Sequence, residues 1–198
     1  MTAYEGSAED RVLRKKVPVT VLVSGGIDST ALLKKYLSAR ETIRAIHFQY
    51  GQASGKSELK AVRVVCKHYS QSLHVVNLGF RMVLRGDEFL GRNALFVLAA
   101  SAIETPPSRI SIGIHAGPEM YDTTRLFVAD CQRLLDGYFN GTVVLEAPFV
   151  DYRKEDIISY SKKMNVPLDL TYSCQRRSFS PCGGCPSCLD RQRYLGTR

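Results

Sequence analysis

The sequence predicts an α/β protein with a parallel five-stranded sheet, helices on both faces and a four-cysteine tail at its C-terminal end. Segments rich in β-branched residues alternate with segments of helical periodicity, as in strands joined by crossover helices. Four of the six cysteines fall within residues 174–188, at spacings typical of a metal site. With 198 residues, of which 44% are hydrophobic, the chain suits one domain with a substantial core.

The first half of the chain alternates strand and helix. Strand patterns are runs of β-branched and aromatic residues, and helix patterns repeat apolar residues at intervals of three and four. The expected strands are 17–23, 43–48 and 73–78, and the expected helices are 28–39 and 55–70. Residues 1–16 carry both charge signs and no apolar core, so we expect a flexible leader and not a secretory signal.

The second half continues the alternation. Glycines at positions 86 and 91 favour a loop over residues 82–91, and residues 92–104 are apolar on nearly every side, which predicts a buried helix. The later expected strands are 109–114 and 142–148, and the later expected helices are 123–136 and 154–164. We therefore expect an α/β domain at 17–170 and a cysteine-rich tail at 171–198 packed on the same domain.

Charge and hydropathy restrict the partners and the location. The formal charge of +8 favours acidic partners such as nucleotides, phosphates or nucleic acid, although a solvated basic surface explains it equally. No apolar run approaches the ~20 residues that a membrane span needs, so no membrane association is expected. Cysteines at metal spacing suit a reducing compartment, which predicts a cytoplasmic protein.

Residues 21–30, VLVSGGIDST, place a glycine-rich turn where the first expected strand ends. Ligands of a parallel sheet bind beyond the carboxyl ends of its strands. Glycines let backbone N–H groups approach an anion, and a helix N-terminus favours negative charge. A carboxylate such as Asp28 tolerates phosphates when Mg²⁺ lies between them, although Asp28 as a simple helix cap is the alternative. The GxxxxGK[ST] and GxGxxG motifs are absent, so the commoner phosphate loops are unsupported.

SGGIDST resembles the PP-loop of the ATP pyrophosphatases. That family cleaves ATP between its α- and β-phosphates and transfers AMP to an oxygen of the substrate. The resemblance implies a set of residues that binds pyrophosphate and its Mg²⁺: Ser24, Gly25, Gly26, Asp28, Ser29 and Thr30.

The tail reads CQRRSFSPCGGCPSC from residue 174 to residue 188. Four thiolates separated by tight glycine and proline turns suit tetrahedral Zn²⁺, bound by Cys174, Cys182, Cys185 and Cys188. A fully thiolate set leaves no open position, so we expect structural zinc; a redox dithiol or an iron–sulfur cluster is the alternative. The arginines around the cysteines either balance the thiolates or contact a phosphate or nucleic acid.

The combination of loop and tail resembles the 7-cyano-7-deazaguanine synthase family of queuosine-precursor synthesis, over residues 17–196. The agreement includes FQYGQ (48–52), GRNALF (91–96), SIGIH (111–115) and TYSC (171–174). The resemblance implies an adenine nucleotide alpha hydrolase-like fold and a homodimer. It implies catalytic roles for Ser24, Asp28, Arg92 and Lys154, further ATP contacts from Tyr50, Gly51 and Gln52, and substrate contacts from Arg92, Asn93 and Asp122.

These roles have structural alternatives. Lys154 would otherwise be a solvated surface lysine, Arg92 would pair with a structural carboxylate, and Asp122 would cap a helix. His47 fits a hydrogen-bonded strand histidine better than a catalytic base. Cys66 and Cys131 fall on helical core faces, where packing explains them.

The reaction implied by the resemblance uses ATP twice. ATP adenylates the carboxylate of 7-carboxy-7-deazaguanine, ammonia displaces AMP to give an amide, and a second ATP drives loss of the amide oxygen to leave the nitrile. The chain departs from the family pattern where Gln49 replaces an aspartate, Ala53-Ser54 replace Arg-His and Met120–Thr123 replace Tyr-Pro-Asp-Cys.

Those departures leave other functions open. A diverged ligase would stop at the amide or join the carboxylate to another amine, on a small molecule or a protein. A tRNA thiolase would need Cys66 or Cys131 as a catalytic thiol. A non-enzymatic zinc module would bind nucleic acid, although we expect no stable nucleic-acid complex.

Overall fold

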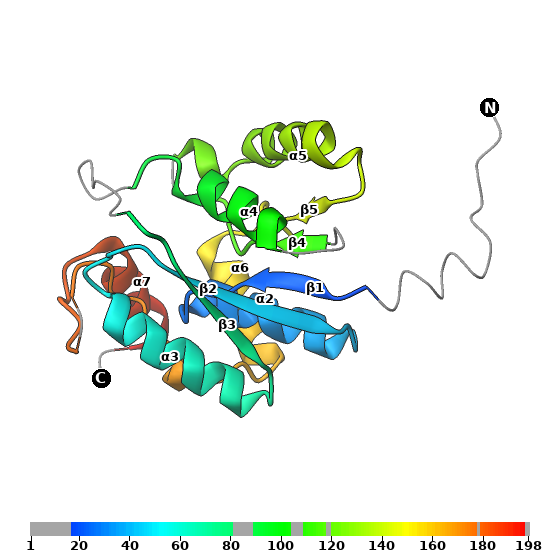
Figure 1. Cartoon of the computed structure of the whole chain (residues 1–198). Coiled ribbons are helices and arrows are strands. Elements are labelled where there is room, and N and C mark those ends of the chain that lie inside the picture. The colour runs from blue at the N-terminus through cyan, green and yellow to red at the C-terminus, as the bar shows by residue number, and fades with distance from the viewer. Residues whose placement is uncertain (1–16, 81–88, 104–108, 118–119, 178, 197–198) are drawn as a thin grey trace.

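The computed structural model describes residues 17–80, 89–103, 109–117, 120–177 and 179–196. Its centre is a five-stranded sheet with the order β3-β2-β1-β4-β5, in which every neighbouring pair is parallel (Figure 1). The strands are β1 (Val19–Leu22), β2 (Ile43–Gln49), β3 (Leu73–Asn77), β4 (Arg109–Ser111) and β5 (Val144–Glu146). The predicted fold class is confirmed. The expected leader at 1–16 and most of the expected loop at 82–91 lie outside the described residues.

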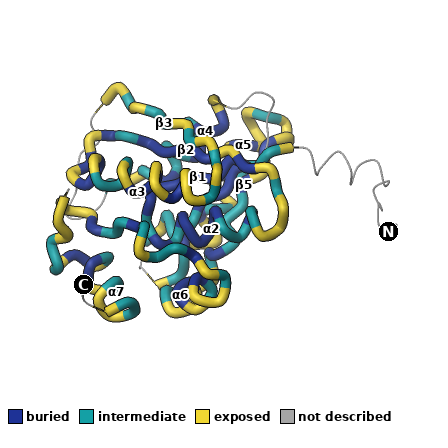
Figure 2. Tube along the Cα trace, turned by 90° about the horizontal axis from the view of Figure 1, so that it is seen from below, coloured by how far each residue is buried: buried dark blue, intermediate teal, exposed yellow. Residues whose placement is uncertain are grey.

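Helices cover both faces of this sheet (Figures 1 and 2). The helices are α2 (Ile27–Ser38), α3 (Gly55–His68), α4 (Arg92–Ile103), α5 (Arg125–Phe139), α6 (Lys154–Lys163) and α7 (Pro186–Leu195). Two single turns of 3₁₀ helix occupy Tyr121–Thr123 and Leu168–Leu170. Because side chains alternate along a strand, β1 sends Val19 and Val21 to the core under α2, α3 and α6, and Leu22 to the core under α4 and α5.

Three expectations about the helices need correction. The expected helix at 123–136 begins at Arg125, because the Thr124 hydroxyl caps it by accepting the N–H of Phe127 at 3.2 Å. Helix α4 is not buried all round: Ile103 is 40% exposed, because α4 lies on the outside of the sheet, where it packs against α5 and β4. The tail contains α7, a helix that we did not expect, because its sequence is mostly polar and lacks an apolar stripe.

A polar network joins α2 to strands β4 and β5 of the sheet. The Tyr36 hydroxyl lies 2.9 Å from Ser111 Oγ and 2.5 Å from Glu146 Oε2. Arg109 Nε donates to Glu146 Oε1 at 2.5 Å, and Arg109 also pairs with Glu41. Burial raises the pKa of Tyr36, and the Glu146 carboxylate raises it further, so the hydroxyl remains a donor at neutral pH.

We expect Tyr36→Phe to lower the free energy of unfolding by about 1–3 kcal/mol, because it leaves Ser111 and Glu146 without their shared donor. Urea denaturation measures this change. Tyr138→Phe is the matched control, since Tyr138 is 74% exposed and should change stability by less than about 0.5 kcal/mol. Equal stability of both variants would show that the network contributes nothing.

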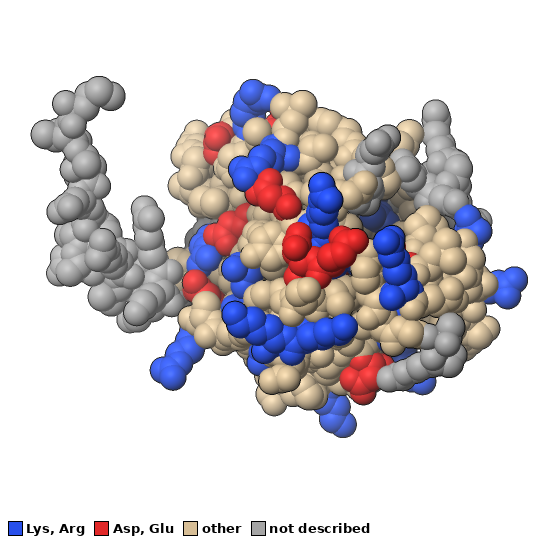
Figure 3. Space-filling view, turned by 180° about the vertical axis from the view of Figure 1, so that it is seen from behind, with Lys and Arg blue, Asp and Glu red and all other residues tan. Residues whose placement is uncertain are grey.

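The surface mixes charges on the face seen in Figure 3, where acidic and basic side chains lie next to one another. Within the described residues, none of the helices has the length and apolar character needed to cross a membrane.

Candidate active site

A cavity of about 1150 Å³ opens at the carboxyl ends of β1, β2 and β4. Its walls come from the turn after β1, the start of α4, the segment that follows β4, the start of α6 and the tail. Most predicted site residues line it: Ser24, Gly26, Asp28, Ser29, Tyr50, Arg92, Asn93 and Lys154. Five do not line it, namely Gly25, Thr30, Gly51, Gln52 and Asp122.

The turn from Ser24 to Gly26 is held by its own hydroxyls. Ser29 Oγ accepts the Ser24 N–H at 3.1 Å, and Ser24 Oγ accepts the Gly26 N–H at 3.3 Å. Thr30 Oγ1 donates to the Gly26 carbonyl at 2.8 Å, so this hydroxyl stabilises the turn and does not face the cavity. The turn is thus built before any ligand enters.

Gly25 must be glycine at this turn. Its φ is +82°, and a Cβ built there would lie 2.9 Å from the Glu58 carbonyl oxygen and 2.9 Å from the Val62 nitrogen. Both neighbours belong to the backbone of α3, which cannot move away without distorting that helix. The glycine therefore sets how closely α3 packs against the turn.

The N-terminus of α2 faces the cavity. Gly26 occupies the N-cap position and no side chain caps the helix, so the alternative role of Asp28 as a cap does not hold. The first N–H groups of a helix have no intrahelical acceptor. These N–H groups and the helix dipole both favour binding of an anion. This end of α2 is therefore suited to a phosphate.

Asp28 is paired with Lys154 across the cavity. Lys154 Nζ donates to both Asp28 oxygens, at 2.6 and 2.8 Å, and both side chains are largely buried. A lysine in the first turn of α6 opposes the helix dipole, and the Asp28 carboxylate compensates for this. The alternative of a solvated surface lysine does not hold.

His115 completes this cluster and was missed by the sequence reasoning. Its Nε2 lies 3.7 Å from Asp28 Oδ2. Its Nδ1 lies 2.7 Å from the Ala116 carbonyl oxygen, which only accepts, so Nδ1 carries the proton. Its position in SIGIH, just after β4, was the available signal.

The opposite wall of the cavity is aromatic. Tyr50 packs against Phe96 with ring centroids 5.2 Å apart, and Arg92 Nη1 donates to the Tyr50 hydroxyl at 3.5 Å. Burial raises the pKa of Tyr50, and the Arg92 charge opposes this rise. A flat hydrophobic surface beside a guanidinium suits a planar ligand that carries negative charge.

Asp122 lies behind this wall and not on it. Asn93 Nδ2 donates to the backbone carbonyl of Asp122 at 3.2 Å, and Met120 and Thr123 on either side line the cavity. Burial raises the pKa of the Asp122 carboxyl. Asn93 thus fixes the turn that carries Asp122.

Gln52 and His47 have structural partners. Gln52 accepts the Tyr50 N–H at 2.9 Å and donates to Glu58 at 2.9 Å, which shapes the turn after β2. His47 Nδ1 donates to the Val23 carbonyl at 2.8 Å, and Gln49 Nε2 donates to His47 Nε2 at 2.5 Å. Burial lowers the pKa of His47, so the ring is neutral and acts as a satisfied strand histidine.

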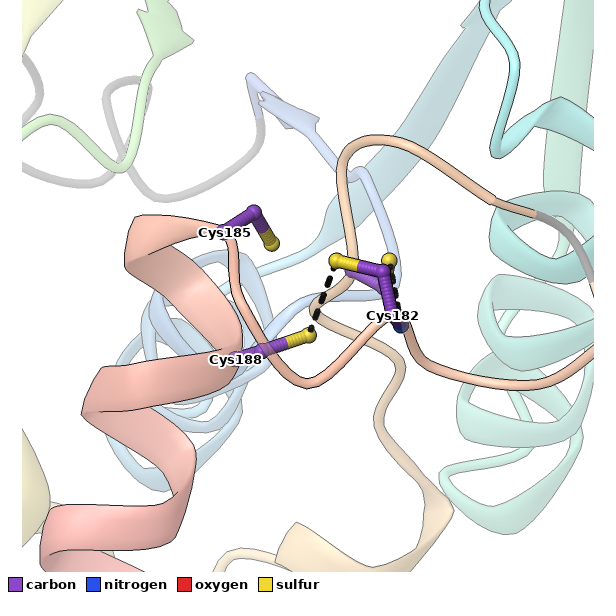
Figure 4. Close-up of side chains that lie close together, drawn as sticks. Cys182, Cys185 and Cys188 are labelled. Atoms are coloured by element: carbon purple, nitrogen blue, oxygen red, sulfur yellow. Dashed lines mark hydrogen bonds between the residues drawn. The ribbon is translucent and has the colours of Figure 1, made fainter.

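The four tail cysteines converge, as predicted. Their sulfur atoms all lie within 4.8 Å of one another, and Figure 4 shows the side chains of Cys182, Cys185 and Cys188 directed toward a common point. Tetrahedral Zn²⁺ with Zn–S bonds of about 2.3 Å needs sulfurs about 3.8 Å apart. The Gly184 N–H group lowers the pKa of Cys182 to about 6, which favours the thiolate. The cluster can bind a metal such as zinc.

The tail supports the turn from Ser24 to Gly26 directly. The Tyr172 N–H donates to the Gly25 carbonyl at 2.9 Å. Arg191 of α7 donates to the Leu168 carbonyl at 2.9 Å and to Thr171 Oγ1 at 2.8 Å. The cysteine cluster and the turn are therefore mechanically connected.

We expect Cys185→Ser to lose the bound metal and to lower the melting temperature, because the polar tail has little apolar core of its own. Elemental analysis should fall from about one zinc per chain in the wild type to near zero. Cys131→Ser, outside the cluster, is the control and should keep the metal. Full metal content in Cys185→Ser would contradict this assignment.

Cys66 and Cys131 do not line the cavity. They are 2% and 4% exposed, within the cores under α3 and α5. Burial raises the pKa of Cys66 to about 11 and also raises that of Cys131. Neither thiol is suited to catalysis, which disfavours a thiolase.

Comparisons with known proteins agree with this geometry. A family model described as "Queuosine biosynthesis protein QueC" matches residues 18–91 and 89–197. A 7-cyano-7-deazaguanine synthase of Aquifex aeolicus (strain VF5) is 30% identical, covering 92% of this chain and 98% of the relative. One from Caldicellulosiruptor saccharolyticus is 32% identical, covering 86% and 87%.

Solved structures are similar at the level of the fold. An NMN synthetase from Francisella tularensis is 12% identical with a TM-score of 0.54, covering 96% of this chain and 82% of that one. An NH3-dependent NAD synthetase from Campylobacter jejuni is 18% identical with a TM-score of 0.50, covering 82% and 70%.

Proposed function

The chain belongs to the QueC family of queuosine biosynthesis proteins, and on this basis we propose that it is an ATP-dependent C–N ligase that converts 7-carboxy-7-deazaguanine to 7-cyano-7-deazaguanine. The observation that carries the proposal is the Asp28–Lys154 pair at the turn after β1, within a cavity walled by Tyr50 and Arg92. The pair supports the proposal of a phosphate site, and the Tyr50–Arg92 wall supports a site for a planar acid in the same cavity.

ATP binds with its β- and γ-phosphates at the turn from Ser24 to Gly26. Backbone N–H groups of the turn and of the first turn of α2 contact the phosphate oxygens. Asp28 and the Ser29 hydroxyl offer the oxygen ligands that Mg²⁺ prefers, and Mg²⁺ bound with ATP neutralises phosphate charge. Lys154, held beside Asp28, donates to a phosphate oxygen once ATP is present.

Adenylation requires the substrate carboxylate to reach the α-phosphorus. Tyr50 and Phe96 stack on the deazaguanine ring, Arg92 binds the carboxylate, and Asn93 positions the turn that carries Asp122. One carboxylate oxygen forms a bond to the α-phosphorus while the bond to pyrophosphate breaks. Pyrophosphate leaves with the charge that Lys154 and the loop N–H groups stabilise.

Ammonia then attacks the activated carbon. The carbon–nitrogen bond forms, the carbon–oxygen bond to AMP breaks, and the amide results. The amide oxygen attacks a second ATP in the same way, and loss of a second AMP and of both amide protons leaves the nitrile. Each AMP carries away one oxygen of the original carboxylate.

A second candidate is a ligase that joins the carboxylate to a larger amine. The cavity extends past the phosphate turn to Glu155, Asp190 and Tyr194, and its volume of about 1150 Å³ exceeds the ~300–1000 Å³ of common ligand pockets. Gln49 and the segment Met120–Thr123 also depart from the family pattern. Such an enzyme would accept a small-molecule or protein amine and stop at the amide.

Two further expectations remain proposals. The exposed apolar side of α4, including Ile103, would be covered in a homodimer. A cytoplasmic location suits the four reduced cysteines.

The test incubates the metal-loaded protein with ATP, Mg²⁺, ammonium and 7-carboxy-7-deazaguanine, followed by mass spectrometry. The nitrile as product supports the synthase, and the amide alone supports the second candidate. If neither product forms and ATP is left intact, both candidate functions are contradicted. Omission of ammonium is the control and should leave only adenylated acid.

A further inference from the structure

Helix α3 carries a stripe of cations along its exposed side. The stripe consists of Lys56, Lys60, Arg63 and Lys67, all exposed. Their spacing of four, three and four residues places them on one face, and the stripe is about 16 Å long at 1.5 Å per residue. The face shown in Figure 3, by contrast, mixes both charge signs.

No acid offsets this stripe. Glu58 is the one acidic residue of α3, and it is turned toward Gln52 and Ser54, whose side chains donate to it at 2.9 and 2.5 Å. Among the residues that the structure describes, no carboxylate forms a salt bridge with any of the four cations. The stripe therefore presents a field of one sign to solvent.

An exposed phenylalanine stands at the N-terminal end of the stripe. Phe179 is 82% exposed and has a φ of +76°, a region that bulky residues rarely occupy. Its N–H donates to Ser57 Oγ of α3 at 2.7 Å, and Lys56 Nζ lies 5.9 Å from its ring centroid. The chain thus adopts an unfavourable backbone conformation at a residue whose large apolar ring lies in solvent and gains nothing from burial.

The loop that carries Phe179 adjoins the cavity. The Tyr172 hydroxyl donates to the Arg177 carbonyl at 2.5 Å, and Tyr172 and Gln175 line the cavity. Arg176 and Arg177, three and two positions before Phe179 in the chain, are also exposed. The basic stripe, the ring and the cavity mouth thus form a continuous path.

We propose that this path binds single-stranded RNA, with phosphates along α3 and a base stacked on Phe179. A basic stripe along one helix is the electrostatic signature of nucleic-acid binding, and an aromatic ring among cations stacks an unpaired base. Folded RNA presents unstacked bases in its loops, whereas duplex DNA does not. An acidic polypeptide would match the cations but has no base for the ring. The proposal is independent of the reaction proposed above and departs from the expectation that no stable nucleic-acid complex forms.

The test measures binding of the zinc-loaded full chain to a fluorescent single-stranded RNA of about 20 nucleotides by anisotropy, over a range of salt. With about four phosphate contacts, one for each cation of the stripe, the slope of log K against log salt should be about −2.8. Lys60→Glu with Arg63→Glu should make the slope shallower by about 1.4. Lys162→Glu with Lys163→Glu on α6 changes the net charge equally and should retain the wild-type slope.

The aromatic ring is tested separately from charge. Phe179→Leu keeps the apolar side chain and the backbone strain but should weaken binding at least about fivefold, whereas Phe179→Trp should bind like the wild type. Duplex DNA of the same length should bind less tightly and be insensitive to Phe179→Leu. Three results would overturn the proposal. Single-stranded RNA does not bind at low salt, the slope of the α6 variant becomes as shallow as that of the α3 variant, or Phe179→Leu binds RNA with unchanged affinity.

Discussion

Gly25→Ala will abolish productive ATP binding while the sheet remains folded. Alanine at a φ of +82° is strained by about 1–2 kcal/mol, and its Cβ would meet backbone atoms of α3 at 2.9 Å. Relief of this contact moves the turn or α3, so the N–H groups that face the phosphates lose their alignment. We expect adenylation to fall by at least about 100-fold, which corresponds to about 2.7 kcal/mol.

The measurement is carboxylate-dependent exchange of pyrophosphate into ATP, together with circular dichroism to establish folding. Gly137→Ala is the matched control, because a Cβ at Gly137 in α5 has no heavy atom within 4 Å. That variant should keep full activity and gain about 0.5–1 kcal/mol of stability. Equal activity of the two variants would remove the argument for close packing at the turn.

Asp28→Asn will lower the rate of adenylation by about 100- to 1000-fold, with the fold retained. The amide has the shape of the carboxylate but no charge, so it neither offers a Mg²⁺ ligand of the same strength nor holds the Lys154 ammonium, which Asp28 binds at 2.6 and 2.8 Å. The readout is the rate of pyrophosphate release at saturating ATP and Mg²⁺.

Asp151→Asn is the control for this variant. Asp151 forms an exposed ion pair with Arg125, neither residue lines the cavity, and loss of the pair should leave the rate unchanged. If Asp28→Asn kept more than about a third of the wild-type rate, Asp28 would have only the structural role of pairing with Lys154.

Much of the fold was predictable because hydrophobic periodicity reports burial. The two valines of β1, Val19 and Val21, and the buried apolar residues of α3 face the core that the hydrophobic pattern predicts. Helix α7 was missed because it is held by contacts that leave no apolar stripe: Arg191 donates to Thr171, just after the 3₁₀ turn Leu168–Leu170, and the Tyr194 hydroxyl donates to Glu155. Tertiary contacts, and not local pattern, specify this helix.

The site was predictable where the local motif itself builds the geometry. Ser24, Gly25 and Gly26 form a turn whose side-chain hydrogen bonds all come from Ser24, Ser29 and Thr30, within the motif itself. Asp122 was harder to place, because its position depends on how α4 and the 3₁₀ turn pack, and the cavity excludes its side chain. His115 was missed for the same reason: its proximity to Asp28 arises only when β4 aligns beside β1.

The central claim is that the turn after β1 activates a carboxylate by transferring AMP to it. It is tested most directly with 7-carboxy-7-deazaguanine labelled with ¹⁸O in both carboxylate oxygens, ATP, Mg²⁺ and ammonium, and mass spectrometry of the released AMP. The account predicts that every AMP formed in the coupled reaction carries one ¹⁸O, with two labelled AMP molecules for each nitrile. Unlabelled AMP, or a product formed without pyrophosphate release, would contradict it.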